Sequence, residues 1–86
     1  MELTFFSSAF CEPCVQTRAI LAEVERLVPA ATVRELDVAR DNAEAEAADI
    51  RNTPTIIVQN AAGEEVFRAT GVPTLAQVLI ATAKAL

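Results

Sequence analysis

The chain has 86 residues, of which 52% are hydrophobic, and its seven basic and twelve acidic residues give a formal net charge of −5 with no histidine. That length predicts one domain, residues 1–86, with enough apolar residues for a compact core. The acidic balance argues against nucleic acid and against anionic membrane surfaces as partners, because both recognise clustered Lys and Arg.

The N-terminal segment lacks a basic stretch followed by a long apolar one, so the sequence predicts no signal peptide. No apolar run approaches the roughly 20 residues of a membrane span. We therefore expect a soluble, cytoplasmic protein. A mature form from which a signal had been removed would have the same sequence character.

The first half of the chain predicts a strand, a helix and a second strand. Residues 3–6 are apolar and β-prone, which is typical of a buried strand, and serines follow them in a loop. Pro13 suits the first turn of a helix, and Pro29 ends the helical spacing of apolar residues. Residues 32–38 alternate imperfectly between apolar and polar, as a strand does. A crossover helix between these two strands favours a parallel pairing.

The second half predicts a short helix, a hairpin and a final helix. Residues 41–44 resemble a capping box, and the helix that they begin is expected to run to Ile50. Residues 55–58 predict a buried strand, and residues 64–69 return as a second strand after a turn, which suggests a hairpin. Pro73 is expected to open the last helix. The predicted order is β-α-β-α-β-β-α.

The two cysteines, Cys11 and Cys14, lie just after the first predicted strand, at the start of the first helix. Free N–H groups and the helix dipole stabilise an anion there, so the first thiol can lose its proton more readily. The thiolate is the attacking species in disulfide exchange. We interpret Cys11 as the exposed nucleophile and Cys14 as the resolving thiol, which attacks the mixed disulfide and releases the reduced substrate.

A structural or a metal-binding role suits the cysteine pair less well. A disulfide that closes so short a loop would stabilise the fold little through chain entropy. A tetrahedral zinc site needs about four ligands, and the chain has no other cysteine and no histidine. We therefore expect no metal and no cofactor within one chain. A metal that bridges two copies of the pair stays an alternative.

Four segments resemble the thioredoxin family. Residues 10–14 (Phe-Cys-Glu-Pro-Cys) resemble its active site, an aromatic residue followed by Cys-x-Pro-Cys. Residues 36–41 resemble its second shared strand and the turn after it, and residues 50–55 its loop with a cis-proline. Gly71 falls where the family has a glycine ahead of the last helix. The resemblance implies a thioredoxin-like α/β fold, with a four-stranded mixed sheet of strand order 2-1-3-4 flanked by three helices.

The same resemblance implies a substrate-binding rim. Pro54 should be cis and packed beside the cysteine pair, and Thr53 would offer its backbone to an extended substrate segment. The alternative for this dipeptide is an ordinary turn that begins a strand. Gly71, Val72 and Pro73 would join the rim, although Val72 could instead belong to the core. We favour a docking role for Phe10.

Three positions depart from the family pattern. Thioredoxins usually keep a buried acid where this chain has Phe5, so a water or another group must accept the proton of Cys14. Phe10 replaces the tryptophan before the first cysteine, and Glu12 replaces the glycine after it. We regard Glu12 and Pro13 as candidate residues for redox tuning. A solvated acid in the first helical turn is the alternative interpretation of Glu12.

The leading functional hypothesis is an enzyme: a thiol–disulfide oxidoreductase that reduces protein disulfides by dithiol exchange. We expect a monomer that is reduced by a thioredoxin-reductase type electron donor. Glutathione-dependent, glutaredoxin-like activity is disfavoured, because residues 71–74 include no acidic pair; Arg18 and Arg51 are its candidate contacts. Two further alternatives are a dedicated electron donor of one partner enzyme and a redox-switch binding module.

Overall fold

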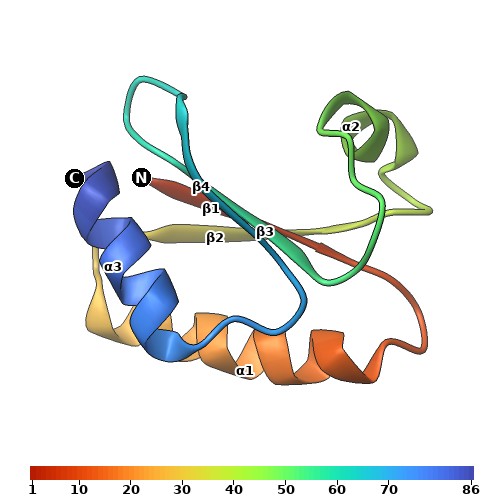
Figure 1. Cartoon of the computed structure of the whole chain (residues 1–86), viewed down its shortest axis with the longest axis horizontal. Helices are drawn as coiled ribbons and strands as arrows, with labels where there is room; N and C mark the ends of the chain where they lie inside the picture. The colour runs from red at the N-terminus through yellow and green to blue at the C-terminus, as the bar shows by residue number, and fades with distance from the viewer.

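The computed structural model describes all 86 residues, Met1–Leu86, and consists of a four-stranded mixed sheet with three helices (Figure 1). The elements in chain order are β1 (Glu2–Ser7), α1 (Glu12–Leu27), β2 (Thr32–Asp37), α2 (Asn42–Ala47), β3 (Thr55–Gln59), β4 (Glu65–Thr70) and α3 (Leu75–Ala85). The strand order is β2-β1-β3-β4. β1 is parallel to β2 and antiparallel to β3, which forms a hairpin with β4. The implied fold and the predicted order of elements are confirmed.

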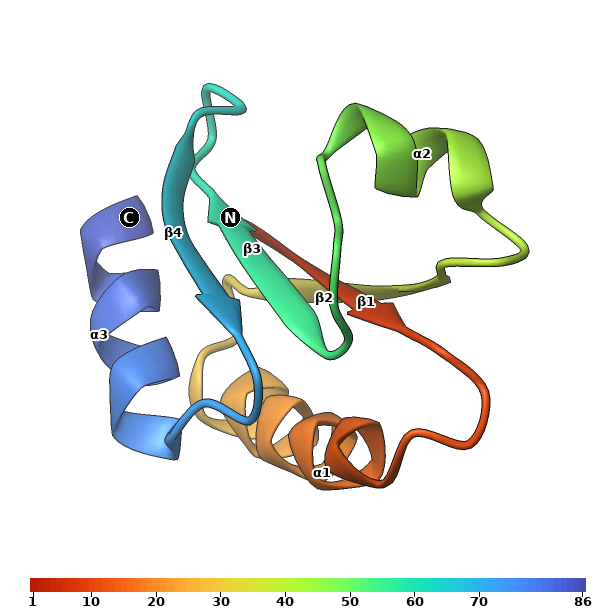
Figure 2. The same ribbon diagram turned by 45° about the vertical axis from the view of Figure 1, so that its right-hand side comes forward.

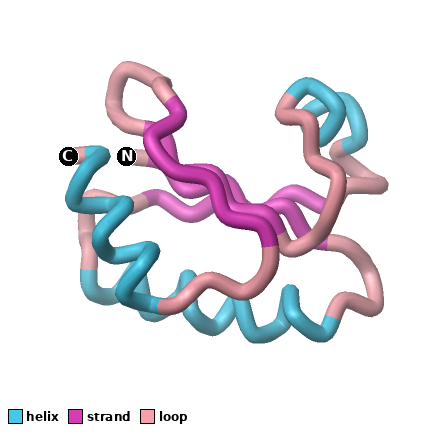
Figure 3. The backbone as a smooth tube through the Cα atoms, in the orientation of Figure 1, coloured by secondary structure: helices cyan, strands magenta, loops and turns pink.

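α1 and α3 cover one face of the sheet, and only the short α2 lies on the other (Figures 2 and 3). The alternation of side chains along β1 explains this arrangement. Leu3 and Phe5 pack in the main core with residues of α1 and α3, while Phe6 lies in a smaller cluster with Ala45 of α2. No helix has both the length and the apolar character that a membrane span needs.

The start of α1 is built around the cysteine pair. Cys11 is the N-cap residue, and its Sγ accepts a hydrogen bond from the Cys14 N–H at 3.1 Å. Pro13 lies in the first turn, where its missing N–H costs no helical hydrogen bond. The helix ends at Leu27, two residues before Pro29. Its buried face consists of Cys14, Thr17, Leu21 and Val24.

The predicted capping box of α2 is wrong. Asp41 is the N-cap residue, but its side chain makes no cap hydrogen bond. Its Oδ2 instead accepts from the Asp37 N–H at 3.0 Å and from the Arg40 guanidinium at 2.8 Å. The carboxylate is therefore engaged with the preceding turn and cannot face the helix.

α2 also ends at Ala47, earlier than the predicted Ile50. Asp49 has a positive φ of 57°, and the Ile50 N–H donates to the Ala45 carbonyl at 2.9 Å. This is the Schellman pattern of helix termination. Its apolar contact is present as well, because Ile50 packs against the cluster that contains Ala45.

The last helix begins later than predicted. Thr74, not Pro73, starts it: the Thr74 Oγ1 accepts from the Gln77 N–H at 3.1 Å, and the Gln77 Oε1 accepts from the Thr74 N–H at 2.9 Å. These reciprocal bonds form a capping box. Pro73 is buried just ahead of the helix, so the expectation that it belongs to an exposed rim is wrong.

Candidate active site

Cys11 and Cys14 form a disulfide, with their Cα atoms 5.2 Å apart. The two residues differ in burial. Cys11 is half-buried, whereas Cys14 is only 1% exposed and belongs to the main core. The predicted division of roles requires this asymmetry, because a substrate disulfide can reach only an accessible sulfur.

The start of α1 supplies an electrostatic reason for reactivity at Cys11. Its Sγ is the cap acceptor for the Cys14 N–H, and the positive end of a 16-residue helix points toward it. A thiolate at this position gains from both contributions. The arrangement therefore favours the reactive form of the outer cysteine.

The loop before β3 lies beside the disulfide. The Thr53–Pro54 peptide bond is cis, which confirms the expected isomer, and Pro54 is fully buried. The Thr53 hydroxyl donates to Cys11 Sγ across 3.8 Å. The Gly71 N–H donates to the Pro54 carbonyl at 2.9 Å, so Gly71 also lies at this loop, with a positive φ of 89°.

The backbone of Thr53 is open to a partner. Neither its N–H nor its C=O has a hydrogen-bond partner within the chain. Most polar groups of the backbone are paired in folded proteins. The unpaired groups of Thr53 therefore leave an edge on which an extended peptide could add hydrogen bonds.

Three apolar side chains are exposed at or near the elements that carry the site. Phe10 is fully exposed and adopts a positive φ of 56°, and Val72 is 41% exposed, so Val72 is not a core residue. Val15, directly after Cys14, is 54% exposed. Val15 was not predicted as a site residue, although it stands one position off the buried face of α1.

A hollow of about 470 Å³ adjoins the disulfide. Its walls come from the loop after β1 and from the first two turns of α1. It is lined by Ser8, Phe10, Cys11, Glu12, Val15 and Arg18. Pro13 lies in the same first turn of α1 but does not line the hollow. Sequence reasoning did not single out Ser8, because one polar residue in a serine-containing loop carries no pattern.

The guanidinium of Arg18 is paired with the carboxylate of Glu35. Its Nε and Nη2 donate to Glu35 at 2.8 and 2.7 Å, and the Ser7 hydroxyl donates to the same carboxylate at 2.8 Å. The hydrogen bonds from Arg18, aided by that from Ser7 and opposed by partial burial, hold the pKa of Glu35 below its usual value. The guanidinium also lies 5.8 Å from the ring centroid of Phe5.

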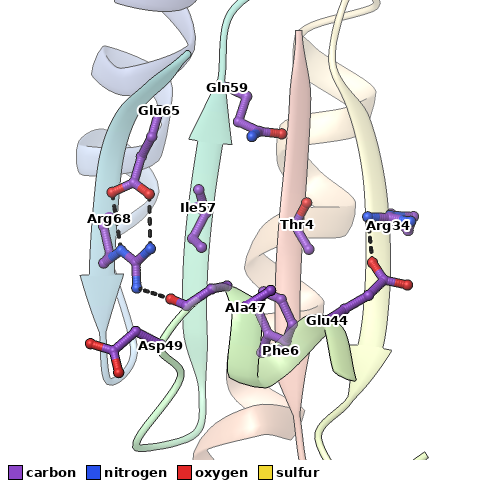
Figure 4. Close-up of a pocket in the computed structure, with 11 residues that line it drawn as sticks. Thr4, Phe6, Arg34, Glu44, Ala47, Asp49, Ile57, Gln59, Glu65 and Arg68 are labelled. Carbon is purple, nitrogen blue, oxygen red and sulfur yellow. Dashed lines mark hydrogen bonds and ion pairs between the residues drawn. The ribbon is translucent and has the colours of Figure 1, made fainter. Parts of the chain in front are cut away.

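A larger hollow of about 510 Å³ lies on the α2 face of the sheet (Figure 4). Both of its arginines are engaged: Arg68 binds Glu65 and the Ala48 carbonyl, and Arg34 binds Glu44. It has no thiol, and no three His, Cys, Asp or Glu side chains come together as metal ligands anywhere in the chain. The candidate active site is therefore the cysteine pair.

Several solved thioredoxin structures are similar to this chain. Oxidised mitochondrial thioredoxin 3 from Saccharomyces cerevisiae has a TM-score of 0.82 and 19% identity, over 99% of this chain and 77% of that one. A mutant thioredoxin from Halobacterium salinarum NRC-1 has a TM-score of 0.86 and 23% identity, over 99% and 74%. The reduced Schistosoma mansoni thioredoxin pre-protein has a TM-score of 0.85 and 25% identity, over 99% and 78%.

No protein-family model and no curated protein sequence matches the chain. The likeness in structure shows a thioredoxin-like fold. Together with the Cys-x-x-Cys pair, it supports thiol–disulfide oxidoreductase chemistry in general.

Replacing Glu12 should make the nucleophilic thiol more acidic. Glu12→Gln removes a negative charge next to Cys11, and we expect the apparent pKa of the reduced Cys11 thiol to fall by roughly 0.3–0.5 unit, a small shift because solvent screens an exposed side chain. Titration of the thiolate ultraviolet absorbance measures it. Glu25→Gln, an exposed acid further along α1, is the matched control. Equal midpoints for Glu12→Gln and the unmodified protein would refute a tuning role for this residue.

The Arg18–Glu35 pair should make stability depend on pH. Because the pKa of Glu35 is lowered in the folded state, its contribution is complete above the unfolded value of about 4.3 and is lost as the pH falls through the folded value. Glu35→Gln should cost about 0.5 kcal/mol at neutral pH, since both side chains are at least one-third exposed. Urea unfolding at neutral and at acidic pH tests this, and a cost that persists unchanged in acid would contradict it.

Proposed function

We propose that the chain reduces disulfide bonds in protein substrates, with Cys11 as nucleophile and Cys14 as resolving thiol. The observation that carries the proposal is the asymmetric burial of the pair at the start of α1, beside the Thr53–Pro54 loop. A half-buried sulfur at a helix N-terminus is suited to attack a substrate disulfide. A buried sulfur one turn away is suited to act afterwards, as the thiol that resolves the mixed disulfide.

The reaction transfers two electrons in two exchange steps. The Cys11 thiolate attacks one sulfur of the substrate disulfide, forms a mixed disulfide and releases the other substrate sulfur as a thiolate. The Cys14 thiol then loses its proton and attacks Cys11 Sγ, which forms the Cys11–Cys14 disulfide and releases the second substrate sulfur. The released thiolates take up protons from solvent or from the resolving thiol. Phe5 fills the place of the family acid, so solvent or another group must accept the proton of Cys14.

The substrate would lie as an extended segment along the Thr53 backbone. The unpaired N–H and C=O of Thr53 support this pairing, because they can add to a short strand. Phe10 and Val72 would cover the apolar side chains of the segment, and Gly71 and Pro54 would shape the loop beneath it. The substrate class is therefore a protein with an exposed disulfide in an apolar, extended segment.

We further propose that a thioredoxin-reductase type donor returns the two electrons, in the cytoplasm, to a monomeric protein. Glutathione is a less suitable donor, because its carboxylates would need free cations near the thiol. Arg18 is held by Glu35, and Arg51 donates to Asp49 at 3.1 Å. The start of α3 offers the capping pair of Thr74 and Gln77 in place of acidic residues.

Turnover should require both cysteines. The intact protein should reduce insulin with dithiothreitol or a thioredoxin reductase as electron source. Cys11→Ser should abolish the reaction, and Cys14→Ser should stop after a mixed disulfide that mass spectrometry detects, because no resolving thiol remains. Absence of turnover with any reductase or with glutathione would favour the redox-switch module. Turnover confined to one partner enzyme would favour the dedicated electron donor.

Phe10 should increase the rate of reduction of protein substrates but not of small disulfides. Phe10→Ala should lower kcat/KM for insulin by about 3–10-fold, the loss expected for about 1 kcal/mol of apolar contact. Reduction of a small disulfide reagent, which does not reach the rim, should change less than about twofold by the same reasoning. Ile80→Ala is the control, since Ile80 is 59% exposed and does not line the hollow. An equal loss for both substrates would exclude a docking role for Phe10.

A further inference from the structure

Two hydroxyl groups from separate loops meet beside Cys11. Ser8 follows β1, and Thr53 precedes β3. The Ser8 Oγ and the Thr53 Oγ1 are 2.7 Å apart, a short hydrogen bond between hydroxyls. The Thr53 Oγ1 lies 3.8 Å from Cys11 Sγ. Both residues are half-buried, so the three atoms form a chain that is partly shielded from solvent.

The direction of donation along these hydrogen bonds follows from which groups carry a proton. A disulfide sulfur carries no proton, so the Thr53 hydroxyl must be the donor to Cys11 Sγ. The single Thr53 proton is then used, and its oxygen accepts from Ser8. The order of donation is Ser8 to Thr53 to Cys11. A thiolate is a far stronger acceptor than a disulfide sulfur, so this chain strengthens when the pair is reduced.

Few groups besides the Ser8–Thr53 hydroxyl pair can stabilise a thiolate at Cys11. Its Sγ accepts from the Cys14 N–H, and Thr53 supplies the second donor. Arg18 lines the same hollow, but Glu35 holds its guanidinium through two hydrogen bonds. Glu12 adds a negative charge next to the sulfur. A donor from the hydroxyl pair therefore acts against the charge of Glu12.

We propose that Ser8 is a positioning residue for the thiol chemistry of Cys11. Its hydroxyl donates to the Thr53 oxygen, which keeps the Thr53 proton directed at Cys11 Sγ and polarises that O–H group. The Ser8–Thr53 hydroxyl pair thereby stabilises the Cys11 thiolate. Its biological use rests on the proposed function, but the thiolate itself can be measured without any substrate.

The test is a thiolate titration of reduced variants. Thr53→Val should raise the apparent pKa of Cys11 by about one unit, the order of one hydrogen bond to a charged group. Ser8→Ala should raise it by about half as much, because Thr53 keeps its hydroxyl but loses its orientation. The double variant should not exceed Thr53→Val by more than the error of the titration, because Ser8 acts only through Thr53. Thr53→Ser keeps the hydroxyl, so its apparent Cys11 pKa should stay close to that of the unmodified protein.

Ser7→Ala is the matched control. Ser7 is the neighbouring serine, is 4% exposed and donates to Glu35 instead of to Thr53. Its loss removes a hydroxyl and affects stability without touching the chain to Cys11. The titration midpoint of Ser7→Ala should therefore match the unmodified protein. A midpoint for Ser8→Ala equal to that of the unmodified protein, or an equal shift in Ser7→Ala, would overturn the proposal.

A second readout separates this inference from the proposed function. The rate of Cys11 alkylation by iodoacetamide, measured at a pH at least one unit below the titration midpoint, should fall about twofold in Ser8→Ala. A shift of about half a unit lowers the thiolate fraction about threefold, and the greater nucleophilicity of the more basic thiolate offsets part of that loss. Alkylation needs no protein substrate. Failure of insulin reduction alongside the expected shift would contradict only the function. Normal insulin reduction with unchanged alkylation would contradict only the role of Ser8.

Discussion

Burial of Cys14 in the main core is the constraint on which the site depends. Cys14 belongs to the same cluster as Leu3 and Phe5 of β1, so the first turn of α1 is held against the sheet. Cys11 lies one turn earlier, as the N-cap residue, and must stand at the edge of that core. This packing leaves Cys11 as the accessible sulfur, and its position as the N-cap residue puts the positive end of the helix dipole beside it.

The sheet register brings the other half of the site to the same edge. β1 and β3 are antiparallel neighbours, and Phe6, the last residue but one of β1, is paired with Thr55 at the start of β3. The loop after β1 and the loop before β3 must therefore lie side by side. Ser8 and Thr53 are 45 residues apart in the chain, but this pairing makes their hydroxyls neighbours.

Sequence patterns predicted the elements well and the local contacts poorly. The strand pairs, the start of α1 at the cysteines and the Thr53–Pro54 loop follow from periodicity, proline placement and family resemblance. The Asp41 cap failed because a carboxylate with several donors within reach binds the most favourable of them, which here are Arg40 and the Asp37 N–H. Ser8 was missed because its significance arises only from strand register, which one sequence does not show.

This chain has the buried Phe5 where thioredoxins usually keep a buried acid, so the proposed dithiol exchange needs other groups to stabilise and deprotonate the thiols. Glu35 is the register partner of Phe5 on β2, but Arg18 and Ser7 engage its carboxylate, and the ion pair keeps its pKa low. A carboxylate held in its ionised form is a poor proton acceptor at neutral pH, because it has little affinity for a proton there. Glu35 is therefore an acid near the site that is poorly suited to act as the base in the proposed reaction. In the proposed reaction, stabilisation of the Cys11 thiolate would then depend on neutral donors, the Cys14 N–H and the Thr53 hydroxyl, neither of which titrates near neutral pH.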